Sequence, residues 1–196
     1  MAVERAVEGT GEPTRRDAAR NRELLVAAAR RAFARQGPDV PLEEIASEAG
    51  VSRTTLHRHF AHREALASAV LEHNVADIEA RAATLSVADD GAEQLFHHLL
   101  DVQFEVPWLG RVVADGRMPG SADLGERTAA ALAPLLEQAR ARGRVHPGVT
   151  TEDVLLTLPM VMAVQAAMAA GGTPSRVGTT RAILHRGLFT TPPPAG

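Results

Sequence analysis

Residues 41–60, PLEEIASEAGVSRTTLHRHF, constrain the fold of this chain more than any other stretch. The first half has the i, i+3, i+4, i+7 spacing of one apolar helix face, formed by Leu42, Ile45, Ala46 and Ala49. Gly50 follows directly, and glycine can adopt the positive φ that ends a helix. Ser52 can then cap a second helix over 53–60. Two short helices around a glycine turn are typical of a helix-turn-helix unit, whose second helix enters the DNA major groove.

The second helix of this pair has an apolar face and a polar face. Leu56, His59 and Phe60 occupy its inner side. Basic and hydroxyl side chains are left on the outer side and flanks, at Arg53, Thr54, Thr55, His57 and Arg58. Guanidinium and hydroxyl groups can hydrogen-bond to base edges and phosphates, so this face is a candidate DNA contact. An ordinary helical hairpin with a solvated polar face is the alternative.

The neighbouring sequence favours DNA binding. A long helix is expected over 17–36, and another begins at Arg63. The stretches AARRAFARQG at 28–37 and PLEEIASEAGVSRTTLHRHFAHREAL at 41–66 resemble the DNA-binding domain of the TetR family of transcriptional regulators. The resemblance covers about residues 24–66, with several motif positions in register.

The resemblance implies an all-α protein with an N-terminal three-helix helix-turn-helix domain and a C-terminal helical bundle for ligand binding and dimerisation. We expect a disordered arm at 1–13, the DNA-binding domain at 14–63, the bundle at 64–190 and a flexible tail at 191–196. The resemblance also implies a ligand-responsive regulator, more specifically a repressor. We expect it to bind a palindromic operator as a homodimer through its last two helices, and to be released by a small, mostly hydrophobic effector.

The same resemblance identifies candidate DNA contacts, which are Arg15, Arg16, Ser52, Arg53, Thr54, Thr55, His57, Arg58 and Arg63. The sequence leaves open whether Arg53 and Arg58 contact guanine or phosphate. Two positions depart from the family. Pro41 stands where relatives often have a capping Thr or Ser, so Asp39 is a candidate for the cap, and His57 stands where a Tyr is common. A protonated His57 would add positive charge, so we expect DNA affinity to rise as the pH falls.

Composition supports helices. Hydrophobic residues make up 45% of the 196 residues and aromatic residues only 3%, with alanine and leucine dominant. The chain contains no cysteine, and its N-terminus lacks the apolar core of a signal peptide, so we expect a cytoplasmic protein. The net charge is −3, but residues 13–70 carry ten arginines against seven acidic residues. Residues 71–196 carry ten against fourteen. The positive charge is therefore concentrated around the helix-turn-helix segment.

Residues 154–170, VLLTLPMVMAVQAAMAA, form the most apolar stretch, with 17 residues and no charge. A membrane-spanning helix needs about 20 residues. Pro159, Gln165 and the small alanines fit a buried helix better, so no membrane partner is expected. In the family, this helix and the next form a four-helix interface with their symmetry mates. A purely intramolecular core is the alternative.

Apolar residues with a few polar groups mark a candidate effector pocket in the bundle: Phe96, Leu100, Gln103, Phe104, Trp108, Met118, Leu158, Met162 and Gln165. Each of them also fits a plain core position. The histidines His57, His59 and His62 lack metal-site spacing, so no metal or cofactor is expected. His97, His98 and Asp101 lack a nucleophile, and no catalytic motif occurs, so we do not expect an enzyme. A helical interaction module without sequence-specific DNA binding is the alternative function.

Overall fold

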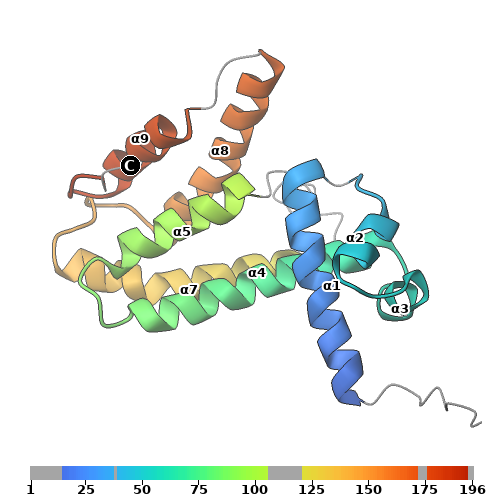
Figure 1. Cartoon of the computed structure of the whole chain (residues 1–196). Helices are drawn as coiled ribbons and strands as arrows, with labels where there is room; N and C mark the ends of the chain where they lie inside the picture. Colours follow the sequence, from blue (N-terminus) through green and yellow to red (C-terminus); the bar gives the residue numbers. More distant parts are fainter. Residues whose placement is uncertain (1–14, 38, 106–120, 172–175, 194–196) are drawn as a thin grey trace, which may run out of the picture.

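The computed structural model describes residues 15–37, 39–105, 121–171 and 176–193. The described part is helical throughout, which confirms the predicted all-α fold (Figure 1). Its helices are α1 (Arg15–Gln36), α2 (Leu42–Glu48), α3 (Arg53–His59), α4 (Arg63–Leu85), α5 (Gly91–Glu105), α7 (Ser121–Ala141), α8 (Thr151–Ala170) and α9 (Val177–Leu188).

The N-terminal unit consists of α1, α2, α3 and the first part of α4. Its core joins Leu25 and Phe33 of α1 to Ile45 of α2, Leu56 of α3 and Leu66 of α4, all at most 1% exposed. Gly50 has φ 69°, which gives the chain its turn between α2 and α3. This arrangement is the expected helix-turn-helix.

The start of α2 differs from the expectation. Pro41 is the N-cap residue of α2, and no side chain caps the helix, so the predicted capping role of Asp39 is wrong. Proline fits this position because the first amides of a helix have no intrahelical acceptor.

Helix α4 belongs to two hydrophobic cores. Leu66 and Val70 lie in the core of the N-terminal unit, whereas Ile78 and Leu85 lie in a second core with α5, α7, α8 and α9. This second core defines the body of the protein. In Figure 1, α4 and α7 run side by side beneath α5, and α1 crosses the opposite end of α4.

Glycine is required at the tight connection between α4 and α5. Gly91 is buried at the start of α5, and a Cβ atom there would lie 2.5 Å from the carbonyl oxygen of Leu85. Any larger residue would push the two helices apart, because the neighbouring atom belongs to backbone.

Two buried histidines join α9 to α5. His97 Nε2 and His185 Nδ1 are 2.9 Å apart, and His185 Nε2 lies 3.0 Å from the carbonyl oxygen of Thr191. A carbonyl can only accept, so His185 carries its proton on Nε2 and accepts from His97 through Nδ1. His97 Nδ1 is then unprotonated, and it is buried without a hydrogen-bond partner. Burial, followed by the neighbouring His185, lowers the pKa of His97 from 6.5 to about 4.

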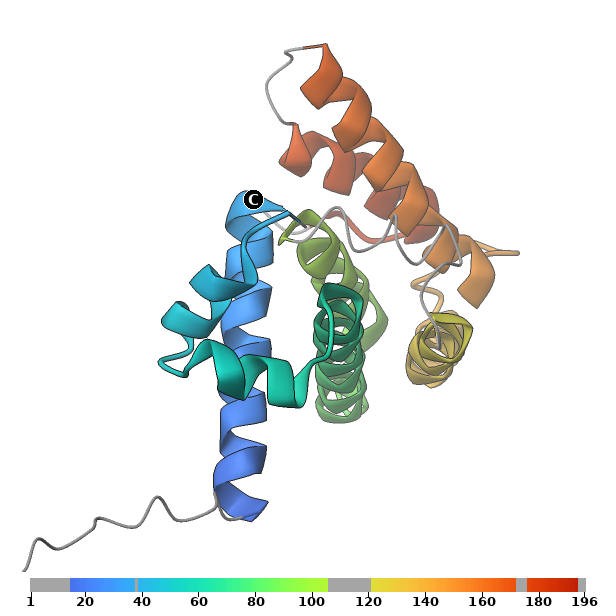
Figure 2. The ribbon, with the colours of Figure 1, turned by 90° about the vertical axis from the view of Figure 1, so that its right-hand side faces the viewer.

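Helix α8 is only partly buried by its own chain. Val154, Thr157 and Val161 are buried, but Leu156, Met160 and Val164 are 59%, 50% and 41% exposed. Among the described residues one helix is long and apolar enough to cross a membrane, over Thr151–Met168, and 17% of that window is buried. Figure 2 shows α8 extending away from the rest of the body. Composition marks a helix that is apolar all round, but it does not say whether its own chain covers it.

The His97 pair makes the stability of the fold depend on pH. Because its pKa is lower in the folded chain, the unfolded chain takes up this proton first as the pH falls. The contribution is complete above about pH 6.5 and is lost towards pH 4, by at most about 1.4 kcal/mol per pH unit. We expect the free energy of unfolding, measured with urea, to fall less steeply in His97→Gln than in the wild type across this window. If the free energy of unfolding fell equally steeply with pH in both proteins, the lowered pKa of His97 would not be the cause of the pH dependence.

Candidate DNA-binding site

The outer face of α3 carries most of the predicted DNA contacts. Arg53, Thr54, His57 and Arg58 are exposed, and Leu56 and Phe60 are buried beneath them. This places two guanidinium groups, an imidazole and a hydroxyl on one side of a seven-residue helix. The geometry suits a helix that lies in the major groove with its first turns against base edges.

Ser52 and Thr55 hold the start of α3. Ser52 Oγ accepts from the Thr55 amide at 3.1 Å, and the two hydroxyl oxygens lie 2.9 Å apart. The predicted N-cap is therefore confirmed. Both hydroxyls have an intramolecular partner, so their part in DNA binding stays a prediction that would require sharing those hydrogen bonds.

Some arginines of the N-terminal unit are held by other groups of the chain, and others are exposed. Arg31 and Arg35 both form ion pairs with Glu48. The hydrogen bond from Arg35 and, to a smaller extent, the one from Arg31 lower the pKa of the Glu48 carboxyl group. Arg63 donates to the carbonyl oxygen of Val40 at 2.6 Å and is half-buried, so it ties α4 to the turn before α2. The predicted contacts Arg15 and Arg16 are exposed at the start of α1.

Arg53 has an acidic neighbour that the sequence did not indicate. Its Nε atom lies 3.1 Å from Glu43 Oε1, across the turn on α2. The same Nε atom lies 3.4 Å from His57 Nε2, one turn along α3. The guanidinium of Arg53 is thus held by its Nε edge at the surface of α3.

The other histidines near α3 have structural roles. His62 is the N-cap residue of α4, and its Nδ1 accepts from the Ala65 amide at 3.2 Å. His59 lies beside Phe60, and burial, followed by the charges of Arg58 and Arg22, lowers its pKa. The positions of His59 and His62 in the sequence do not predict these roles, although a polar residue directly before a helix often caps it.

The predicted effector residues occupy different environments. Phe96 and Leu100 are fully buried core residues, whereas Phe104, Leu158 and Met162 are half-buried. Gln103 Nε2 on α5 and Gln165 Oε1 on α8 are buried atoms without a hydrogen-bond partner. Trp108 and Met118 lie outside the described residues.

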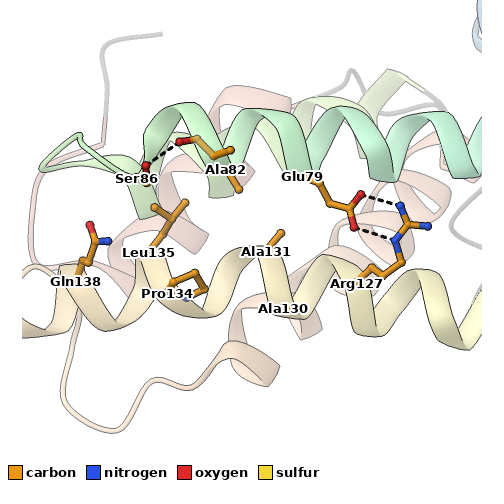
Figure 3. Close-up of a pocket in the computed structure, with 10 residues that line it drawn as sticks. Glu79, Ala82, Ser86, Arg127, Ala130, Ala131, Pro134, Leu135 and Gln138 are labelled. Carbon is orange, nitrogen blue, oxygen red and sulfur yellow. Dashed lines mark hydrogen bonds and ion pairs between the residues drawn. The ribbon is translucent and has the colours of Figure 1, made fainter.

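A groove that the sequence did not indicate lies between α4 and α7. It has a volume of about 460 Å³, and none of the predicted effector residues lines it. Figure 3 shows Leu135 of α7 directed towards α4, and the paired Glu79 and Arg127 at one end of the groove. Arg127 donates to both carboxylate oxygens of Glu79, at 2.8 and 2.7 Å. The remaining walls are mostly small: Ala82, Ala83, Ser86, Ala130, Ala131, Pro134 and Gln138.

Comparison with known proteins agrees with this geometry. The fold and the exposed face of α3 define a helix-turn-helix protein. Residues 25–70 match the family model described as "Bacterial regulatory proteins, tetR family". The match confirms that the helix-turn-helix segment is similar to the TetR family of transcriptional regulators, as its sequence predicted. No curated protein sequence matches the chain.

Several solved structures share the fold. The TetR regulator of Mycobacterium vanbaalenii is 29% identical, with a TM-score of 0.60 over 80% of this chain and 97% of that one. A TetR regulator of Streptomyces coelicolor is 25% identical, with a TM-score of 0.65 over 87% and 99%. A protein from Saccharomonospora viridis, solved in complex with choline, is 20% identical, with a TM-score of 0.63 over 88% and 100%. At that identity the last comparison shows the fold alone.

The position of His57 leads to a test of its contact with DNA. Its imidazole is exposed on the same face as Arg53, and His57 Nε2 accepts from Arg53 Nε at 3.4 Å. An imidazole can hydrogen-bond to a phosphate or a base edge, whereas a phenyl ring cannot. We therefore expect His57→Phe to lower DNA affinity several-fold, by about the contribution of one hydrogen bond. Fluorescence anisotropy at fixed ionic strength measures both proteins, and equal affinities would contradict a role for His57. The pH dependence expected from the sequence stays a prediction.

Proposed function

We propose that this protein is a ligand-responsive repressor that binds a palindromic operator as a homodimer. The observation that carries the proposal is the exposed face of α3, where Arg53, Thr54, His57 and Arg58 surround the buried Leu56. Arg15 and Arg16 at the start of α1 add charge suited to the phosphate backbone. The division into a DNA-binding domain at 14–63 and an effector and dimerisation domain at 64–190 is part of the proposal.

The proposed dimer interface is the exposed side of α8 together with α9. Leu156, Met160 and Val164 recur every four residues and form one apolar stripe, and Ile183 of α9 is 61% exposed. Alanines at positions such as Ala163 and Ala167 would let a second helix approach closely. A stripe of this kind is unusual on a protein surface unless a partner covers it. A second copy of the chain supplies the same stripe and pairs the two helices by twofold symmetry.

The dimer can be tested by placing a charge in the stripe. Met160→Glu puts a carboxylate where the proposed interface excludes water, so we expect the dimer dissociation constant to rise at least about tenfold. Val87→Glu is the matched control, because Val87 is 89% exposed in the loop between α4 and α5 and should not change self-association. Analytical ultracentrifugation measures both. A Met160→Glu protein as dimeric as the wild type would rule out this interface.

We place the effector site between α5 and α8. Gln103 Nε2 and Gln165 Oε1 support this placement, because buried polar groups of native proteins normally have a hydrogen-bond partner. Phe104, Leu158 and Met162 supply half-buried apolar surface on the same two helices. A small, mostly hydrophobic effector with a donor and an acceptor group would match such a site. The choline complex is a property of the Saccharomonospora viridis protein and does not identify the effector of this one.

Release from DNA follows as a shift between two arrangements of the dimer. A ligand that binds more tightly when the two α3 helices are wrongly spaced will lower operator affinity by that difference. Helix α4 connects the body to the N-terminal unit, so its position determines where α3 lies. The operator-bound state has its two α3 helices about 34 Å apart, one turn of DNA.

Selection of bound sites from a random DNA library tests the proposed function. We expect the wild-type protein to enrich a palindrome, and the Arg53→Ala/Arg58→Ala protein to lose or relax it, because each base-specific arginine contributes about 1–3 kcal/mol of discrimination. Circular dichroism should show that both proteins are folded. A folded, dimeric wild type that enriches nothing at low salt would favour the helical interaction module instead.

A further inference from the structure

The ion pair between Glu43 and Arg53 joins the two helices of the helix-turn-helix at its exposed surface. Glu43 is the second residue of α2, and Arg53 is the first residue of α3. Glu43 Oε1 lies 3.1 Å from Arg53 Nε, and the two side chains are 52% and 67% exposed. The pair is therefore accessible to DNA that contacts the outer face of α3.

The contact with Glu43 leaves one hydrogen-bonding edge of Arg53 open. A guanidinium has five N–H donors, and Nε carries only one of them. That donor makes a hydrogen bond to His57 Nε2 at 3.4 Å, and Glu43 Oε1 forms an ion pair with the same nitrogen at 3.1 Å. Neither Nη atom of Arg53 has a hydrogen bond or ion pair within the part of the chain that the structure describes. The remaining fork of two parallel N–H groups matches the O6 and N7 acceptors of guanine.

The charge of Glu43 also gives Arg53 a different electrostatic environment from that of Arg58. A carboxylate beside Arg53 cancels much of its attraction for phosphates and repels the DNA backbone, so Arg53 is poorly suited to a purely electrostatic contact. Within the part of the chain that the structure describes, Arg58 has no acidic contact, and it is exposed on the same face. The two arginines that the sequence left equivalent are therefore different in their surroundings.

We propose that Glu43 is a positioning residue that holds Arg53 for recognition of one guanine in each operator half-site. The inference rests on the proposed function. In water the exposed pair is weak. When α3 lies in the major groove, the bound DNA excludes water from the pair and strengthens both the ion pair and the guanine contact. Glu43 thereby lowers affinity for all DNA while it preserves the contact with the correct base, which is how repulsion contributes to specificity.

Neighbouring acidic residues of α2 provide a matched control. Glu43→Ala removes the partner of Arg53. Glu44→Ala removes the same charge one position later, where the carboxylate accepts from Gln36 Nε2 at 3.0 Å and has no contact with Arg53. Both substitutions reduce repulsion of phosphates, so both should raise affinity for non-specific DNA. Only Glu43→Ala should change base preference.

The experiment starts from the palindrome that the wild type selects and measures affinity for every single-base variant of one half-site. We expect Arg53→Ala to abolish a guanine preference of about tenfold at one base pair. Glu43→Ala should reduce the preference at that same base pair several-fold, Glu43→Asp should restore part of it, and Glu44→Ala should leave it intact. Glu43→Ala added to Arg53→Ala should cause no further loss of preference.

The outcomes separate this inference from the function on which it rests. If the wild type selects no site, the proposed function fails and the inference fails with it. If the wild type selects a palindrome but Glu43→Ala keeps the full guanine preference, only the inference is overturned. It is equally overturned if Arg53→Ala weakens all variants alike, because Arg53 would then be a phosphate contact. Thermal unfolding checks each variant, and Glu43→Gln replaces Glu43→Ala if the alanine protein does not fold.

Discussion

The simultaneous burial of α4 in two hydrophobic cores is the constraint on which the rest of this structure depends. Leu66 and Val70 are fully buried with α1, α2 and α3, and Ile78 and Leu85 are buried with the helices of the body. A continuous helix resists bending, because a sharp kink requires loss of its backbone hydrogen bonds. The N-terminal unit therefore cannot reorient freely about α4 without exposing apolar surface in one core or the other.

Ion pairs reinforce the same connection. Arg30 of α1 contacts Asp77 of α4 at 3.1 Å and Glu105 at the end of α5 at 3.5 Å. Arg127 of α7 contacts both Glu72 and Glu79 on the other side of α4. These pairs are partly exposed, so each contributes little to stability, but together they oppose rotation of α4 about its axis. A ligand in the body would have to move α4 against these contacts to change where α3 lies.

Much of the fold could be predicted from the sequence, because the apolar residues repeat with helical spacing between clear breaks. The bounds of α4, the Ser52 cap and the exposed face of α3 follow from residues close in the sequence. Contacts that depend on how helices cross could not be predicted. Glu43 meets Arg53 across a turn, His97 meets His185 from 88 positions away, and the groove between α4 and α7 needs both helices in place. The sequence left open how much of α8 its own chain covers, because composition does not distinguish a core helix from one with an exposed apolar face.

The central claim is that a rigid α4 lets the proposed dimer set the spacing of its two α3 helices. The most direct test is the affinity of the wild-type protein for its selected operator before and after insertion of about five base pairs between the half-sites, which turns one half-site to the opposite face of the DNA. The control is an operator whose spacer has a different base sequence but the original length. The account predicts that the insertion reduces affinity to about that of a single half-site. Unchanged affinity would show that the two N-terminal units move independently, and would contradict the claim.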